Sequence, residues 1–256
     1  MKDAFSLQDK VAIVTGGNGG IGKAITRGMA AAGADLAIAA RNETKTEEAV
    51  REIQEEFGTK AIGLKVDLQQ EAQIRAMAAK VLKTFGRIDI LINNAGTNIR
   101  KLPQDYTAAE WDEVLNTNLR GAFLCSQAVY PAMKSAGRGK VISIGSMTSL
   151  FGGAKVVLYG ISKGGIVQMT RGLAVAWAPD NIQVNAILPG FINTDLSRQA
   201  RKDVPELETQ VISRTPMKRW GEPEEMAGAA VFLASQASDF ITGVALPADG
   251  GYSIIL

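Results

Sequence analysis

The hydrophobic residues of this chain gather into short runs, and longer amphipathic stretches separate one run from the next. The runs are apolar at nearly every position rather than at every second one, and most end at glycine or a polar residue. Such runs are typical of strands that are buried on both faces of a parallel sheet. The pattern predicts about seven strands, at residues 10–15, 35–40, 61–66, 88–92, 140–144, 182–188 and 241–246.

The stretches between these runs have the periodicity of amphipathic helices. We predict helices over 44–57, 71–85, 107–134, 159–177 and 222–234, and another from the first glycine-rich turn to Gly33. Strands that alternate with helices in this way indicate an α/β fold, namely a Rossmann-type doubly wound parallel sheet with helices on both faces. Asn116 and Asn118 are poor residues for a helix interior and predict a kink or a functional constraint within 107–134.

The chain shows no repeat, no low-complexity tract and no linker, so we predict a single domain over residues 1–256. One segment breaks the rhythm of strands and helices, because residues 193–215 are polar and charged. Long loops in compact domains often act as lids. We therefore expect a loop or helix insertion around 191–215 that covers the substrate.

A glycine-rich turn follows the first strand. Residues 16–22 read Gly-Gly-Asn-Gly-Gly-Ile-Gly, which fits G-x-G-x-x-G in one register and G-x-x-x-G-x-G in another. Glycines let the backbone approach a pyrophosphate closely, and the N-terminus of the following helix presents free N–H groups to it. A strand, a turn and a helix in this order predict a dinucleotide site, and a tight turn without a ligand is the alternative.

The end of the second strand bears on the choice of dinucleotide. An NAD-binding unit places an acidic residue at this point to hold the ribose 2′-hydroxyl. Here Asp35 lies at the start of the strand and cannot reach, while Ala40 and Arg41 stand at its end. A guanidinium suits a 2′-phosphate, so the sequence favours NADP and leaves NAD possible. A solvated Arg41 is the alternative.

Composition narrows the class of protein. The 256 residues are 46% hydrophobic and 21% charged, as in a globular protein with one large core. No apolar run reaches the roughly 18 residues of a membrane span, and the N-terminus has no signal-peptide pattern. A single cysteine, Cys125, fits a reducing compartment, so we expect a cytoplasmic protein. The net charge of +2 gives no global field for nucleic acid.

The chain contains no histidine. This excludes Ser-His-Asp and Cys-His catalysis and makes a metal site improbable, so we predict no metal. Proton transfer would then fall to Tyr, Lys, Asp or Glu. Tyr159 and Lys163 are one helical turn apart, where the cation favours the phenolate, and Ser146 follows the strand at 140–144. A solvated helix face is the alternative for the Tyr–Lys pair.

Polar and glycine residues also follow several strands directly, where ligands bind in sheets of this type. They are Asp67, Asn93, Gly96, Ser146 and Pro189-Gly190. Their convergence on one edge of the sheet predicts a single site.

Over nearly its full length the chain resembles the short-chain dehydrogenase/reductase family. The matching motifs are Thr15-Gly16-x-x-x-Gly20-Ile21-Gly22, Asn93-Asn94-Ala95-Gly96, Asn118, Ser146, Tyr159-x-x-x-Lys163 and Pro189-Gly190, in this order. The resemblance implies that Tyr159 is the general acid/base, that Lys163 binds the nicotinamide ribose and lowers the pKa of Tyr159, and that Ser146 orients the substrate oxygen. It implies that Asn118 holds a water in the proton path to Lys163.

The same resemblance implies which residues contact the cofactor. Asp67 would contact the adenine, Asn94 the adenosine side, and Ile192 and Thr194 the nicotinamide carboxamide. The full expected set is Gly16, Asn18, Gly19, Gly20, Ile21, Gly22, Arg41, Asn42, Asp67, Leu68, Asn94, Ala95, Gly96, Tyr159, Lys163, Pro189, Gly190, Ile192 and Thr194. The family also forms homotetramers, which we expect here through the helices that start near Thr107 and Tyr159.

The substrate is less determined. Segments 149–153 and 219–223 resemble the sugar and aldonate dehydrogenase branch of the family, and the 3-oxoacyl-[acyl-carrier-protein] reductases and general carbonyl reductases are the alternative. Arg100 and Lys101 suit an anionic substrate, unless both are solvated loop residues. The expected substrate residues are Asn98, Arg100, Ser146, Thr148, Gly153, Tyr159 and Phe191. A non-catalytic dinucleotide-binding regulator is the remote alternative.

Overall fold

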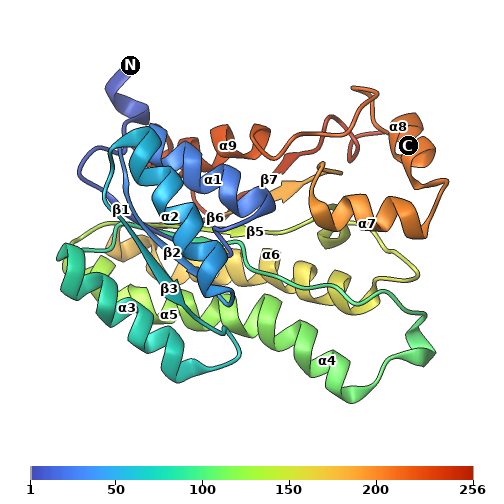
Figure 1. The fold of residues 1–256 in the computed structure, drawn as a ribbon, viewed down its shortest axis with the longest axis horizontal. Coiled ribbons are helices and arrows are strands. Elements are labelled where there is room, and N and C mark those ends of the chain that lie inside the picture. Colours follow the sequence, from blue (N-terminus) through green and yellow to red (C-terminus); the bar gives the residue numbers. More distant parts are fainter. Residues whose placement is uncertain (1, 256) are drawn as a thin grey trace.

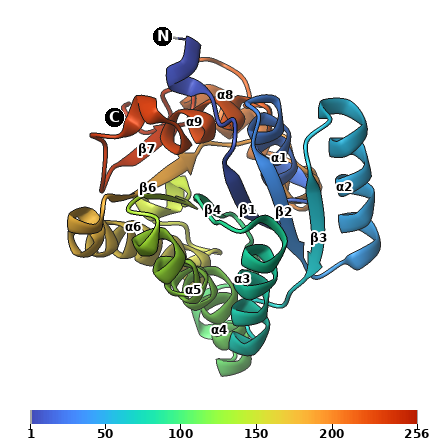
Figure 2. The same ribbon diagram turned by 90° about the vertical axis from the view of Figure 1, so that its left-hand side faces the viewer.

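The computed structural model describes residues 2–255, and within them seven parallel strands form one sheet in the order β3-β2-β1-β4-β5-β6-β7 (Figures 1 and 2). The strands are β1 (Val11–Thr15), β2 (Asp35–Ala40), β3 (Ala61–Lys65), β4 (Ile90–Asn93), β5 (Gly139–Ile144), β6 (Ile182–Pro189) and β7 (Ala245–Ala248). β1, β4, β5 and β6 are buried at every position, as their uninterrupted apolar runs predict.

Helices cover both faces of this sheet (Figure 2). On one face, α1 (Gly20–Ala31), α2 (Glu43–Phe57) and α9 (Glu225–Ala234) enclose a hydrophobic core. On the other, α3 (Glu71–Phe85), α5 (Gly121–Ser135) and α6 (Val157–Trp177) enclose a second one, and α4 (Ala108–Leu115) packs beside α6. The predicted fold class, a Rossmann-type doubly wound α/β sheet, is confirmed.

The helix predicted over 107–134 contains an irregular turn at the two asparagines. α4 is followed by a π-helical turn, Asn116–Arg120, and then by α5. Thr107 caps the start of α4 with a capping box to Glu110. A π turn inserts a residue into the helix, and such turns frequently occur at functional sites.

The last strand begins later than its sequence pattern predicts. Residues 241–244 run beside β6, where side-chain hydrogen bonds interrupt a backbone ladder that keeps the bonds from the Gly243 N–H to the Val184 carbonyl and from the Ala186 N–H to the Val244 carbonyl. The Asn185 amide donates to the Ile241 carbonyl at 2.8 Å, and the backbone N–H of Val184 donates to the Thr242 hydroxyl at 3.1 Å. Gly243 has a φ of +78°, outside the strand region. β7 therefore starts at Ala245 rather than at residue 241.

The segment around 191–215 is mainly helical. It forms α7 (Asp195–Asp203) and α8 (Leu207–Arg214), which lie beyond the carboxyl ends of β6 and β7 (Figure 1). Thr194 caps α7 by accepting a hydrogen bond from the Ser197 N–H. None of the helices within the described range is long and apolar enough to cross a membrane.

Candidate active site

A cavity of about 900 Å³ opens at the carboxyl ends of β1, β4, β5 and β6. The strand order reverses between β1 and β4, since β1 pairs with both β2 and β4, and ligands bind at such switch points in doubly wound sheets. The predicted site residues that line the cavity are Gly16, Gly19, Gly20, Ile21, Gly22, Asn94, Ala95, Gly96, Asn98, Arg100, Ser146, Thr148, Gly153, Tyr159, Lys163, Pro189, Gly190, Phe191, Ile192 and Thr194.

The glycine-rich turn leaves room for a ligand's phosphates. Gly16 and Gly20 have φ angles of +65° and +50°, which favour glycine. A Cβ on Gly22 would lie 2.1 Å from the Gly16 carbonyl oxygen, so this position also requires glycine. α1 begins with Gly19 as its N-cap, without a side-chain cap and without an acidic residue in its first turn. The N–H groups at this helix end are therefore suited to an anion such as a pyrophosphate.

Asn18 and Asn42 join this turn to the start of α2. The Asn18 amide donates to the Thr46 hydroxyl at 2.9 Å, and Asn42 caps α2 by accepting from the Lys45 N–H at 3.0 Å. Neither residue lines the cavity. The two asparagines fix the relative position of the turn and the end of β2, and their direct contact with a cofactor stays a prediction.

Three other expected cofactor residues also lie outside the lining of the cavity. Arg41 is exposed at the end of β2. The Asp67 carboxylate accepts from the Gln69 N–H at 3.0 Å, and Leu68 is buried against Gly121. Cofactor contacts by these residues stay predictions, and the buried Leu68 side chain leaves only its backbone for such a contact.

Asn94 connects the ends of β1 and β4. Its amide donates to the Thr15 carbonyl at 2.9 Å and to the Gly16 carbonyl at 3.2 Å. The Thr15 hydroxyl in turn accepts from the Asn94 N–H at 3.0 Å. These bonds hold the glycine-rich turn in place and leave Asn94 on the wall of the cavity.

Ser146 lies one residue beyond the glycine that follows β5 and caps a single 3-10 turn, Met147–Ser149. Its hydroxyl oxygen accepts from the Thr148 N–H at 3.2 Å. The Ser149 hydroxyl donates to the Lys163 backbone carbonyl at 2.7 Å and accepts from the Ser146 N–H at 3.2 Å. Ser146 is therefore anchored, through Ser149, to the helix that carries Tyr159 and Lys163.

Tyr159 and Lys163 lie on the same side of α6 and both line the cavity, so the solvated-face alternative is wrong. Lys163 is only 4% exposed, its Nζ lies 5.5 Å from the centre of the Tyr159 ring, and it donates to the Ile144 carbonyl at 2.7 Å. Burial lowers the pKa of Lys163 to about 8.

The pKa of Tyr159 moves in the direction opposite to the one expected. Burial raises the pKa of the phenol, and a hydrogen bond with Ser146 lowers it by less. The net shift is upward because burial penalises the phenolate more than its polar neighbours stabilise it. Lys163 is not among the causes of this shift, so its lowering of the Tyr159 pKa stays a prediction.

Asn118 lies in the π turn and is 1% exposed. Its amide donates to the Thr97 carbonyl at 2.8 Å and to the Ser162 hydroxyl at 3.1 Å, while its side-chain oxygen accepts from the Thr97 N–H at 2.7 Å. Asn118 thus connects the loop after β4 with α6. Its role in holding a water stays a prediction. Its side chain positions the loop at Thr97 against α6 at Ser162.

The wall of the cavity also contains expected substrate residues. Asn98 and Thr148 line it, and the Asn98 Oδ1 and Thr148 Oγ1 atoms are buried without a hydrogen-bond partner among the described residues. Arg100 lines the same cavity and is exposed, whereas the neighbouring Lys101 forms an ion pair with Glu110 at 2.5 Å. The two basic residues of this loop are therefore not equivalent.

Lys45, Trp220 and Tyr252 are among the residues of the wall that were not expected from the sequence. Tyr252 follows the carboxyl end of β7, so the strand-end rule could have identified it. Trp220 is buried and contacts Phe191 edge to face, with 5.4 Å between the ring centres. Nothing in the sequence pattern around Lys45 indicates that its side chain turns toward the cavity.

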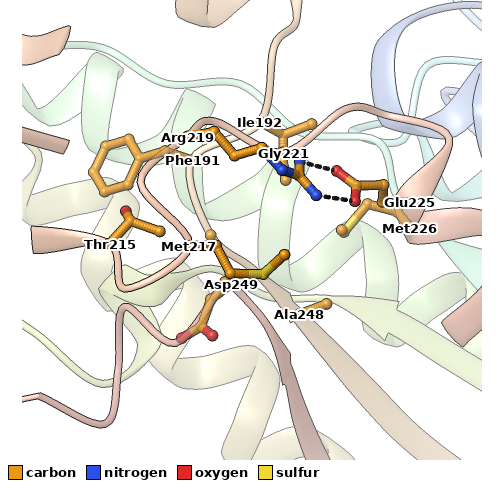
Figure 3. Close-up of a pocket in the computed structure, with 12 residues that line it drawn as sticks. Phe191, Ile192, Thr215, Met217, Arg219, Gly221, Glu225, Met226, Ala248 and Asp249 are labelled. Atoms are coloured by element: carbon orange, nitrogen blue, oxygen red, sulfur yellow. Dashed lines mark hydrogen bonds and ion pairs between the residues drawn. The ribbon is translucent and has the colours of Figure 1, made fainter. Parts of the chain in front are cut away.

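A second cavity, of about 190 Å³, lies behind this wall and shares Gly190, Phe191 and Ile192 with the first (Figure 3). A bidentate ion pair between Arg219 and Glu225 closes one side of it, with N–O distances of 2.6 and 2.7 Å. Arg219 lowers the pKa of Glu225 to about 2, mainly through this hydrogen bonding. The pair supports the segment that carries Phe191 and Ile192. No cluster of potential metal ligands occurs among the described residues.

Comparison with known proteins identifies relatives over the whole length of the chain. A family model described as enoyl-(acyl carrier protein) reductase matches residues 16–253. A 2-dehydro-3-deoxy-D-gluconate 5-dehydrogenase of Escherichia coli K12 is 39% identical over 251 residues, which cover 97% of each chain. A 5-keto-D-gluconate 5-reductase of the same strain is 38% identical over 251 residues, which cover 98% of each.

The solved structures agree with these sequence relatives. A gluconate 5-dehydrogenase from Burkholderia cenocepacia, in complex with NADP and tartrate, superposes with a TM-score of 0.95. It is 37% identical to this chain, and the match covers 100% of this chain and 99% of the other.

Proposed function

The chain belongs to the short-chain dehydrogenase/reductase family, and we propose that it is an NADP-dependent oxidoreductase that interconverts a secondary alcohol and a carbonyl of a sugar acid. One observation carries this proposal. Ser146, Tyr159 and Lys163 line the same cavity as the glycine-rich turn, so a proton-transfer group and a phosphate-binding turn face one ligand space.

Tyr159 is the group that exchanges a proton with the substrate oxygen. Its raised pKa keeps the phenol protonated at neutral pH, which suits donation to a carbonyl oxygen during reduction. In the oxidative direction the phenol must first lose its proton, and the resulting phenolate then accepts the proton of the alcohol. Ser146 shares a hydrogen bond with Tyr159, and its hydroxyl orients the substrate oxygen toward the phenol.

Lys163 supports the proton transfer through its charge. With a pKa of about 8 it is mostly protonated at pH 7, and its ammonium lies close enough to the Tyr159 ring to stabilise negative charge that develops on the phenol. The hydrogen bond to Ile144 fixes one of its three protons and leaves two others for the ribose of the cofactor.

NADP fits the residues present. The uncapped start of α1 and the glycine-rich turn would hold the pyrophosphate, Lys163 the nicotinamide ribose, and Ile192 and Thr194 the carboxamide. When bound, this group supplies the hydride acceptor or donor, and the protein supplies position and the proton. The NADP in the Burkholderia structure supports the same choice, and Arg41 at the end of β2 adds a cation on the adenosine side.

The polar groups that line the cavity together with Tyr159 support a sugar-acid substrate. Arg100 offers a guanidinium to a carboxylate. The buried oxygens of Asn98 and Thr148 have no hydrogen-bond partner among the described residues, so they are available to bind substrate hydroxyls. The remaining expected substrate residues, Gly153 and Phe191, shape the wall beside them. The names of the two Escherichia coli relatives point to the same class of substrate.

A panel of substrates tests the proposal. The purified protein is incubated with NADPH or NADH and with keto-aldonates, neutral ketoses, simple ketones and acetoacetyl thioesters, and oxidation of the cofactor is followed at its absorbance band. The proposal expects the highest kcat/KM for a keto-aldonate with NADPH. Fastest turnover of an acyl thioester would favour an acyl-carrier-protein reductase instead. Cofactor binding without turnover of any substrate would favour a regulator.

A homotetramer and a cytoplasmic location remain our proposals. Trp111 on α4 and Phe123 on α5 are more than two-fifths exposed, and Val175 on α6 is 81% exposed. Large apolar side chains on this surface support an interface between copies of the chain. Light scattering of the purified protein tests the assembly, and a monomer would contradict it.

A further inference from the structure

The Lys45 side chain reaches across from α2 to the glycine-rich turn. Its Nζ lies 3.0 Å, and its Cε 3.4 Å, from the position that a Cβ on Gly19 would occupy. Lys45 also lines the large cavity together with Gly16, Gly19 and Gly20. A residue with a side chain at position 19 would displace this ammonium, so the glycine keeps a cation at the entrance to the phosphate-binding turn.

Three of the basic residues around Lys45 form ion pairs with carboxylates. Lys23 pairs with Glu52 at 2.5 Å, Arg27 with Glu56 at 2.5 Å, and Lys65 with Glu43 at 3.4 Å. All three pairs use acidic residues of α2. Among the side chains that the structure describes, no carboxylate oxygen lies within the 4.0 Å of an ion pair from the Lys45 ammonium.

The charge of Lys45 acts on an acidic residue of the same cavity. Asp195, the first residue of α7, also lines the cavity. Arg198 lowers the pKa of Asp195 most, and Lys45 adds a smaller electrostatic lowering. The ammonium therefore lies between the glycine-rich turn and the segment expected to cover the substrate, and its charge is available to a ligand anion.

We propose that Lys45 binds the adenosine 2′-phosphate of NADP and contributes more than Arg41 to the choice of NADP over NAD. This inference rests on the proposed function and adds a residue to it. Lys45 enters from α2, directly after the strand end that holds the adenosine ribose, whereas the pyrophosphate sits at the start of α1. Both side chains are exposed, but Lys45 lines the cavity and Arg41 does not.

Hydrogen bonds hold the first turn of α2, which carries Lys45, next to the glycine-rich turn. Asn42 accepts from the Lys45 N–H at 3.0 Å, and Asn18 of the glycine-rich turn donates to Thr46 at 2.9 Å. The first turn of α2 is thus tied to the turn that holds the phosphates. A lysine is a mobile point charge on a flexible stem, so it matches a phosphate without the bidentate geometry that Arg41 would require.

Calorimetric titration of the protein with nucleotides tests the proposal without measuring turnover. The ligands are NADP+, NAD+, adenosine 2′,5′-bisphosphate and ADP, of which only the first and third carry a 2′-phosphate. Lys45→Met should weaken NADP+ and the bisphosphate about fivefold to tenfold, as expected for one lost charge-assisted contact, and leave NAD+ and ADP within about twofold. Lys45→Arg should keep most of the affinity, and Arg41→Ala should cost less than Lys45→Met.

Lys23→Met is the matched control, because Lys23 lies on α1 near the same turn but pairs with Glu52. It should leave all four affinities unchanged. Equal weakening of NADP+ and NAD+ by Lys45→Met would place the ammonium on the pyrophosphate and overturn the proposal, as would unchanged binding of both. If the wild-type protein bound neither dinucleotide, the proposed function itself would fall, which is a different result from an insensitive Lys45.

Discussion

The Lys163 ammonium donates a hydrogen bond of 2.7 Å to the backbone carbonyl of Ile144, the last residue of β5. Through this bond the helix that carries Tyr159 is joined to the strand that leads into Ser146. The position of the three side chains therefore depends on a buried cation, although burial disfavours its charge and lowers the pKa of Lys163 to about 8.

The burial of Lys163 should make stability depend on pH. The pKa of Lys163 is about 8 in the folded protein and 10.5 ordinarily. Below pH 8 the lysine is charged in both states, and its burial as a cation lowers the free energy of unfolding. The full cost is about 3 kcal/mol, and it is regained as pH rises from 8 to 10.5 because the unfolded state then binds more protons. Replacement of Lys163 by Met should remove this dependence.

Urea unfolding of wild type and Lys163→Met at pH 7 and pH 9.5 measures the effect. At pH 7 the variant should be the more stable protein, since the lost hydrogen bond to Ile144 offsets only about 1–2 kcal/mol. Its advantage should shrink by about 2 kcal/mol between the two pH values. An advantage that is the same at both would show that the lysine is not buried as a cation.

Asn118 should contribute to stability more than a typical polar residue. Its side chain satisfies both backbone groups of Thr97 and contacts the Ser162 hydroxyl. Asn118→Ala would leave these buried groups without partners, at a cost of about 2 kcal/mol in the free energy of unfolding. Asn116→Ala, in the same π turn, is the control and should cost less than half as much. Equal effects of the two substitutions would contradict the assignment.

Arg100 should recognise the charge of the substrate. Arg100→Ala should raise the KM for a keto-aldonate about tenfold or more, with little change for a neutral ketose, because one charge-assisted contact is lost. Lys101→Ala is the matched control, since Lys101 already pairs with Glu110. Steady-state kinetics of both variants on both substrates checks this. A similar rise for acidic and neutral substrates would remove Arg100 from the carboxylate site.

The order of strands and the position of the site were predictable because both follow from local patterns. Uninterrupted apolar runs define buried strands, and glycines at residues 16–22 define a turn whatever packs around it. The one-turn spacing of Tyr159 and Lys163 places them on one side of a helix in any fold. These predictions required no knowledge of contacts between distant residues.

Other features depend on such contacts and could not be predicted. The direction of the pKa shift of Tyr159 results from burial, which the sequence does not display. The start of β7 is set by two hydrogen bonds, from the Asn185 amide to the Ile241 carbonyl and from the Val184 N–H to the Thr242 hydroxyl. Each bond joins residues that are nearly 60 positions apart in the chain. The orientation of the Lys45 side chain depends on the space that a glycine at position 19 leaves free. No sequence pattern connects these two positions.

Replacement of Tyr159 by Phe tests the central claim most directly, because it removes only the proton-carrying oxygen. Turnover of a keto-aldonate with NADPH is measured for both proteins, and NADP+ affinity is measured by calorimetry as the control for folding. The account predicts that kcat falls by a factor of about 10² to 10⁴ while NADP+ affinity stays within about twofold. A variant that turns over as fast as wild type would contradict the assignment of Tyr159 as the acid and base.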